Sequence, residues 1–275
     1  MDYLSLLKKE ARRRHLSPRT IDSYSFCIDK FFLWLKKDPK KVTKQDVLAF
    51  LDILVDKGVS GSTLNVYHMA IRFFFTEILK KRVAWNIHYA KTPKKLPVFL
   101  TKEETKRLLD AIPNELHKLM VQLCYGAGLR VSELTHLKKE DLDLENKIGW
   151  VRHGKGDKDR MFIIPLLLLS SLQTLIAKKD PGSYLFIGRK GALSVRSIQE
   201  ILKKAGKKAQ LGKHVHPHML RHSFATHLVE NGTDICSVQS LLGHNSARTT
   251  MIYVHMAKPK LSNVRSPLDG ENEKI

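Results

Sequence analysis

The stretch HPHMLRHSFATHL, residues 216–228, places four histidines and one arginine close together, directly after the basic run KKAGKKAQLGKHV. Three interpretations compete at this point. His218 and His222, spaced i, i+4, could begin a metal site, although no further ligand follows at a suitable spacing. The stretch could be an ordinary helix with some polar positions, or it could be a catalytic surface that binds phosphate. The rest of the sequence has to distinguish them.

Length and composition are those of a soluble globular protein. The chain has 275 residues, of which 43% are hydrophobic and 27% charged, so we expect two modest domains. The longest apolar run, MFIIPLLLL, is interrupted by Pro165 and is far shorter than the ~20 residues of a membrane span. The N-terminus lacks the order of a secretory signal. We therefore expect a cytoplasmic protein without a membrane partner.

The cysteines suggest neither a disulfide framework nor a zinc finger. Cys27, Cys124 and Cys236 are odd in number, far apart and in no C-x-x-C spacing. We expect reduced thiols, no metal and no cofactor.

The net charge of +21 points to a polyanionic partner, most simply nucleic acid. Residues 1–95 hold 20 lysines and arginines against 9 aspartates and glutamates, and the remainder holds 28 against 18. Both halves are thus basic. Two folded basic halves favour a clamp that holds a DNA duplex from two sides.

The first half is typical of a helical domain. Ser17 and Pro18 form an N-cap signal, and Thr43 with Asp46 forms a capping-box pattern. Apolar residues repeat at helical spacing along 17–37, 43–58 and 62–81. Together with residues 3–14, these segments predict a four-helix domain over residues 1–90. The Pro- and Lys-rich segment 91–98 is the predicted linker.

The second half predicts a mixed domain over residues 99–257. Thr101 with Glu104 begins a new helix. The alternation around GKGD predicts a β-hairpin over residues 148–165, and SYLFIG, residues 183–188, is another strand candidate. The pattern is helical again from SVRSIQEILKKAG to about Met256. The predicted fold class is mainly α with a small β-hairpin or sheet in the second domain.

Cleaving and rejoining a DNA phosphodiester without metal or ATP needs a particular set of side chains. A phenol can attack phosphorus reversibly, arginine forks can hold phosphate oxygens, and histidine and lysine can exchange protons. Four segments supply these parts in order: GAGLRVSEL, HGKGDKDR, HMLRHSFATHL and LLGHNSARTTMIYVH. The candidate catalytic residues are Arg130, Lys155, His218, Arg221, His244 and Tyr253.

This ordered set resembles the tyrosine recombinase (phage integrase) family, most closely its Xer-type members. The resemblance lies in residue identity as well as in spacing. It is carried by LLGH followed by T-T-x-x-Y-x-H, and by the lysine in a GKG turn. The resemblance covers nearly the whole chain. It implies a helical, SAM-like core-binding domain, a linker, an α+β catalytic domain and a C-terminal tail, residues 258–275, that exchanges between protomers.

The resemblance also implies a role for each site residue. Tyr253 attacks the phosphate and forms a 3′-phosphotyrosyl link, while Arg130 and Arg221 hold the non-bridging oxygens. His218 and His244 donate hydrogen bonds or move the proton. Lys155 protonates the leaving 5′ oxygen, and Glu133 orients the site. His222 and His227 are interpreted as structural or DNA-facing.

The implied function is site-specific recombination of double-stranded DNA at an inverted-repeat-type site. The enzyme would work as a homotetramer on two duplexes, with a paralogue or accessory protein as a further partner. The short chain favours resolution of chromosome or replicon dimers, and integration of a mobile element is the alternative. A DNA-binding relative that lost the chemistry and a type IB topoisomerase are further alternatives. The complete catalytic set argues against the first, and the two-domain layout against the second.

Overall fold

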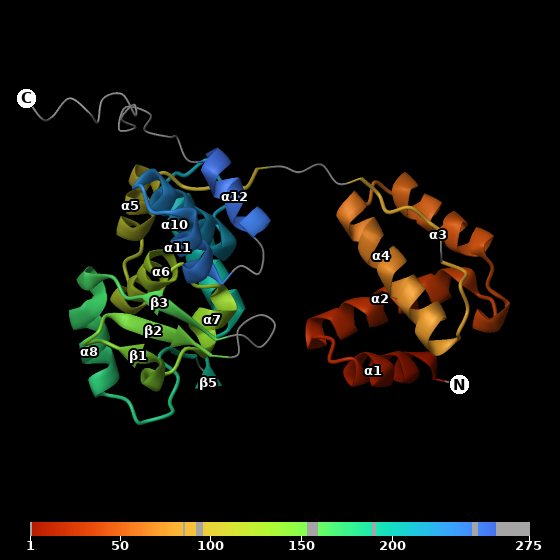
Figure 1. Ribbon diagram of the computed structural model, residues 1–275, viewed down its shortest axis with the longest axis horizontal. Helices are drawn as coiled ribbons and strands as arrows, with labels where there is room; N and C mark the ends of the chain where they lie inside the picture. The colour runs from red at the N-terminus through yellow and green to blue at the C-terminus, as the bar shows by residue number, and fades with distance from the viewer. Residues whose placement is uncertain are drawn as a thin grey trace, which may run out of the picture. The chain divides into compact units, whose positions relative to one another are not determined.

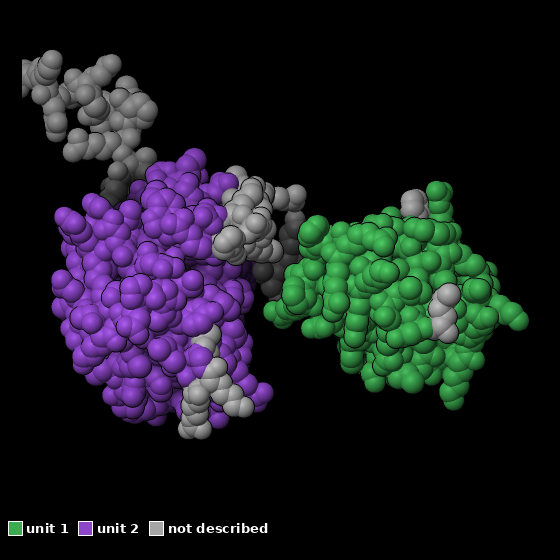
Figure 2. Space-filling model, turned by 90° about the horizontal axis from the view of Figure 1, so that it is seen from below, with its two compact units in different colours: residues 1–95 green, residues 96–275 purple. Residues whose placement is uncertain are grey.

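The structure, a computed structural model, describes residues 2–84, 86–91, 96–152, 159–188, 191–243 and 247–256. The chain folds into two compact units, residues 1–95 and 96–275 (Figure 2). The predicted linker, 91–98, straddles the boundary between them. No helix in the described ranges is long and apolar enough to cross a membrane.

Unit 1 consists of helices, as the apolar stripes predict. Its elements are α1 (Tyr3–Arg13), α2 (Pro18–Leu35), the 3₁₀ turn η1 (Pro39–Lys41), α3 (Lys44–Asp56), α4 (Gly61–Phe73) and the π-helical turn η2 (Phe74–Ile78). The Ser17 side chain caps α2, and Thr43 with Asp46 forms the capping box of α3, as predicted. The prediction of one regular helix over 62–81 was wrong at its end, because the last turns widen to π geometry at Phe74.

The core of unit 1 is built from aromatic rings on the inward faces of these helices. Phe31 meets Phe50 and Phe75 edge to face, with ring centroids 5.1 and 6.1 Å apart. Phe31, Phe74 and Phe75 are fully buried. These rings are therefore packing residues of the core and not stacking platforms for bases.

Unit 2 combines helices with a three-stranded antiparallel sheet (Figure 1), one face of which stays partly exposed at Met161 and Ile163. The order is α5 (Lys102–Asp110), α6 (Glu115–Gly126), α7 (Val131–His136), η3 (Lys139–Asp141), β1 (Leu142–Asp143), β2 (Ile148–Val151), β3 (Arg160–Ile163), η4 (Leu166–Leu168), α8 (Leu169–Ala177), β4 (Ile187–Gly188), β5 (Gly191–Ala192), α9 (Val195–Lys208), α10 (Pro217–Glu230), α11 (Ile235–Leu242) and α12 (Ala247–Met256).

The predicted hairpin is present, and the predicted strand over 183–188 is mostly absent. β2 pairs with β3 in a register that sets Trp150 opposite Met161, and β1 adds a short third strand. Within 183–188, Tyr184 makes an isolated bridge to Lys138, and Ile187 and Gly188 form β4. The chain turns between these two pairings, so an apolar run that satisfies strand propensity does not form one continuous strand.

α10 is the central helix of unit 2. Nine of its residues are buried, including Arg221 and His227, so it has no single apolar stripe. It packs against α6, α9, α11 and α12. A smaller cluster of Phe224, Val238, Leu242 and Tyr253 joins α10, α11 and α12. This cluster brings the HMLRH stretch next to the tyrosine near the end of the described chain.

Candidate active site

Arg130 begins α7 and is fixed there by Glu133. Its backbone N–H donates to Glu133 Oε2 at 2.7 Å, and its guanidinium Nη1 donates to Glu133 Oε1 at 2.6 Å. The chain enters α7 through Gly128, which adopts a left-handed φ of +58°. A Cβ at this glycine would lie 2.4 Å from the Phe224 ring on α10. Backbone conformation and space therefore both require glycine here.

Glu133 is shared by three arginines from three elements. Besides Arg130, the Arg160 guanidinium at the start of β3 donates to Glu133 Oε2 at 2.6 Å, and Arg221 Nη1 lies 3.7 Å from that oxygen. Burial alone would raise the pKa of Glu133, but Arg160, the Arg130 N–H and Arg221 together hold the pKa below its ordinary value. The carboxylate is therefore ionised at neutral pH and orients the arginines.

Arg221 is buried and anchored by backbone carbonyls. It donates from Nη1 to the Gly128 carbonyl at 2.6 Å and from Nη2 to the Leu242 carbonyl. Burial, and then the charge of Arg130, lower the pKa of Arg221 to about 10. Its guanidinium thus stays charged at neutral pH while lying in the protein interior, where its charge acts more strongly on its neighbours than it would in water.

Tyr253 lies on α12 with its ring in the cluster shared by α10, α11 and α12, and only 1% of the residue is exposed. Its hydroxyl lies 3.1 Å from Nδ1 of His222. Burial raises the pKa of Tyr253, whereas the charges of Arg221 and Arg130 act in the opposite direction. The phenol is therefore protonated at neutral pH and lies within the electrostatic reach of both arginines.

The structure brings together Arg130, Arg221 and Tyr253 from the predicted set. His218 lies exposed on α10, one turn before His222, and its charge acts on that residue. Lys155 and His244 lie outside the described residues.

Two residues of this site were missed by the sequence interpretation. Arg160 is the last residue of HGKGDKDR, and the sequence interpretation assigned it no role. Its ion pair with Glu133 nevertheless joins β3 to α7. Its Nη1 also donates to the Leu241 carbonyl at the end of α11. His222 was interpreted as structural or DNA-facing, yet it contacts the hydroxyl of Tyr253. Its adjacency to Arg221 was the one signal available.

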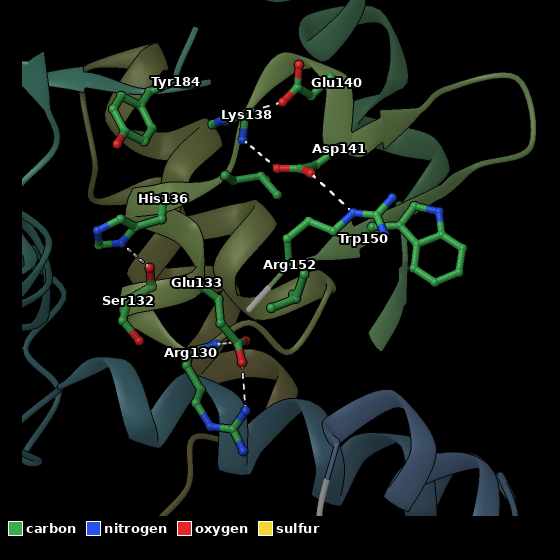
Figure 3. A pocket seen from close by; sticks show the side chains of 12 residues that line it. Arg130, Ser132, Glu133, His136, Lys138, Glu140, Asp141, Trp150, Arg152 and Tyr184 are labelled. Carbon is green, nitrogen blue, oxygen red and sulfur yellow. Dashed lines mark hydrogen bonds and ion pairs between the residues drawn. The ribbon is translucent and has the colours of Figure 1, made fainter. Parts of the chain in front are cut away.

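A pocket of about 650 Å³ opens beside Arg130, between α7, η3 and β2 (Figure 3). The Arg130–Glu133 pair lies at one end and η3 at the other. One wall is lined by Trp150 of β2 and by Arg152, directly after that strand, whose guanidinium carbon lies 5.0 Å from the centroid of the Trp150 ring. Arg130 is thus reached from an open, charged surface, in contrast to the buried Arg160 and Arg221.

Two family models match this chain. The one described as "Phage integrase family" matches residues 98–260, and "Phage integrase, N-terminal SAM-like domain" matches residues 4–85. The chain belongs to the phage integrase family. Both units of the recombinase therefore have counterparts in known proteins, and the family resemblance and fold class inferred from the sequence are confirmed.

Among known proteins, this recombinase is similar to Xer enzymes over most of its length. It is 41% identical to "Tyrosine recombinase XerA" of Thermococcus kodakarensis, over 86% of this chain and 84% of that protein. It is 34% identical to "Tyrosine recombinase XerD" of Oceanobacillus iheyensis, over 96% and 95%. A solved XerH site-specific recombinase, bound to difH substrate before cleavage, matches with a TM-score of 0.72 at 28% identity, over 94% and 83%. The chain is an Xer-like tyrosine site-specific recombinase that acts on DNA.

Proposed function

We propose that this recombinase cleaves and rejoins DNA through a 3′-phosphotyrosyl intermediate, with Tyr253 as the nucleophile and Arg130 and Arg221 as ligands of the scissile phosphate. The observation that carries this proposal is that the Tyr253 hydroxyl lies within reach of both guanidinium charges, although the three residues come from α12, α7 and α10. Paired guanidiniums stabilise the charge that develops on phosphorus during attack.

The proposed step conserves atoms and protons. The Tyr253 oxygen forms a bond to phosphorus as the bond from phosphorus to the 5′ oxygen breaks. Lys155 protonates the leaving 5′ oxygen, and His218 or His244 accepts the phenolic proton. Rejoining runs the same steps backwards, because the phosphotyrosyl ester retains the energy of the bond that was broken.

Covalent trapping tests this assignment. The protein would be incubated with sheared genomic DNA of the organism that encodes it, and denaturant-resistant adducts would be recovered and sequenced. Tyr253→Phe should form no adduct while binding DNA nearly as well, because it loses a single oxygen. Tyr125→Phe is the matched control, since the Tyr125 hydroxyl also lies within hydrogen-bond distance of a histidine, His227, at 2.8 Å. An adduct formed by Tyr253→Phe would contradict the proposal.

The chemistry should need neither a divalent metal nor a nucleotide. The proposed machinery consists of side chains alone, so adduct formation should continue in EDTA at an unchanged rate. Strict dependence of cleavage on a divalent ion would instead revive the metal interpretation of His218 and His222.

The proposed biological role is resolution of chromosome or replicon dimers. Similarity to proteins named XerA and XerD over most of the chain supports it. Integration of a mobile element is the second candidate, favoured by a relative named "Integrase/recombinase" from Escherichia coli, 33% identical over 97% of this chain. The trapped genomic fragments separate the two, since dimer resolution predicts one chromosomal inverted-repeat site and integration predicts the ends of an element.

We further propose that the enzyme acts as a homotetramer on two duplexes, and that residues 258–275 couple the protomers. Those residues lie outside the described part of the chain, and the proposal rests on Leu261, Val264 and Leu268 at roughly helical spacing. Truncation after Lys260 should spare binding to one half-site and impair synapsis. A truncated protein that recombines at the full-length rate would contradict this role.

A further inference from the structure

The contact between His222 and Tyr253 joins two helices at the atom that performs the attack. His222 lies on α10, directly after Arg221, and its Nδ1 is 3.1 Å from the Tyr253 hydroxyl on α12. The two ring centroids are 5.8 Å apart with planes inclined at 46°, so the rings also pack against each other. The contact and the ring packing together constrain the position of the phenol oxygen.

The charges around this hydrogen bond set the protonation states of its two partners. Burial, and then the nearby His218, His216 and Arg221, lower the pKa of His222 to about 4, so its ring is neutral at physiological pH. A protonated Tyr253 has a hydrogen to donate, and a neutral imidazole has one nitrogen free to accept it. With the ring proton on Nε2, the Tyr253 O–H donates and Nδ1 of His222 accepts.

We propose that His222 is a positioning residue of the recombinase, which accepts the Tyr253 hydroxyl proton in a hydrogen bond and so holds the nucleophilic oxygen beside Arg130 and Arg221. This inference rests on the proposed function of Tyr253. It assigns the role to the second histidine of the i, i+4 pair in the stretch at 216–228, not to His218.

His222 is a poor candidate for the general base itself. Its pKa of about 4 lies far below that of a phenol whose pKa burial has raised above the ordinary value of 10. Transfer of the proton to His222 would also create a second cation directly beside Arg221 in a buried site. The histidine therefore orients the oxygen, and the phenolic proton leaves to another group.

The same helix carries a matched control. His227 lies on α10, its pKa is likewise lowered by burial, and its Nδ1 lies 2.8 Å from the hydroxyl of a different tyrosine, Tyr125. Replacing His227 removes a histidine–tyrosine bond from the same core and leaves Tyr253 untouched. A difference between the two replacements reports on the Tyr253 bond and not on general loosening of α10.

The first experiment observes the bond in the full-length protein without DNA. Tyrosines labelled with ¹³C at Cζ give one resonance for each of the seven tyrosines, and Tyr253→Phe identifies the signal of interest. His222→Ala should shift the Tyr253 signal and leave Tyr125 in place, whereas His227→Ala should do the reverse. A Tyr253 chemical shift that is unchanged in His222→Ala would overturn the proposal, and this result does not depend on any activity measurement.

The second experiment measures single-turnover cleavage of a duplex recovered from the genomic trapping, at saturating protein. His222→Ala should cleave about fivefold more slowly, with DNA affinity unchanged. A factor of this size is what the loss of about one neutral hydrogen bond in the transition state would cause. His222→Asn, whose side-chain oxygen can replace Nδ1 as acceptor, should recover most of that loss, and His227→Ala should cleave at the wild-type rate.

The outcomes separate this inference from the function on which it rests. A wild-type protein that forms no adduct refutes the proposed function. A wild-type protein that cleaves while His222→Ala cleaves equally fast, or while His222→Asn is as slow as His222→Ala, refutes only the positioning role.

Discussion

The carboxylate of Glu133 and the guanidinium of Arg160 form a buried ion pair, with Oε2 and Nη2 2.6 Å apart and both side chains less than a tenth exposed. The pair connects α7, whose N-terminus is capped by Arg130, to β3 of the hairpin. Arg160 continues the connection to the carbonyl of Leu241 at the end of α11. The Glu133–Arg160 pair thus connects α7, β3 and α11 at the candidate active site.

Replacing Glu133 with Gln should destabilise unit 2 strongly. The change leaves the buried Arg160 and Arg221 without their counter-charge, and breaking a buried ion pair from one side costs about 3–5 kcal/mol. Urea unfolding would measure the loss. Glu140→Gln is the control, since Glu140 pairs with Lys138 at the surface and such a pair contributes about 0–1 kcal/mol. Equal stabilities for the two variants would show that Glu133 is not the centre of the arginine cluster.

Replacing Gly128 with Ala should lower the free energy of unfolding by more than the left-handed backbone conformation alone explains. Gly128 and Gly182 both have positive φ, +58° and +76°, but a Cβ at Gly182 would meet open space. Gly182→Ala should therefore lose about 1 kcal/mol. Gly128→Ala adds a clash with the Phe224 ring and should lose about 1–3 kcal/mol more. Thermal unfolding of both variants would measure this difference, and equal losses would indicate that the ring simply moves away.

Stability should fall as the pH drops from 7 to 5. The pKa of His222 is lowered in the fold to about 4, so the unfolded chain takes up a proton first as pH falls below 6.5. His216 and His227 also have lowered pKa values through burial and act in the same direction. Melting temperatures across this range should therefore decline less steeply for His222→Asn than for wild type. Parallel pH profiles would mean that His222 titrates normally in the folded protein.

DNA binding should weaken steeply with salt, through charges on both units. Each phosphate contact contributes about −0.9 to the slope of log affinity against log salt. Pairs of neighbouring exposed lysines, such as Lys8 with Lys9 and Lys203 with Lys204, would be changed to glutamine in a scan of each unit. At least one pair in each unit should reduce the slope in binding titrations. A scan of unit 1 that leaves the slope unchanged would contradict the two-sided clamp.

Regular periodicity made most of the fold predictable. The stripes of α2 and α3 and the caps at Ser17 and Thr43 specify helices locally, because each signal acts within a few residues. α10 is different. It is buried on nearly every side, so the motif around Arg221, rather than any amphipathic pattern, was the informative signal.

Contacts between distant elements were not predictable in the same way. The motifs predicted which side chains form the candidate site, and of these the structure places Arg130, Arg221 and Tyr253 together. No periodicity links Arg160 to Glu133, 27 residues away, or His222 to Tyr253, 31 residues away. Such pairs depend on how helices and strands pack, which a single sequence does not specify. The strand prediction over 183–188 failed for the same reason, because pairing partners decide where a strand forms.

Gly243, which ends α11 with a φ of +59°, lies directly under the Arg160 side chain, whose Cδ would be 2.6 Å from an added Cβ. This has a genetic consequence. Asparagine tolerates the backbone conformation but still collides with Arg160, and shortening Arg160 relieves the collision but gives up its bond to Glu133. A strain carrying Gly243→Ala should therefore yield true revertants in a suppressor screen and almost no second-site suppressors.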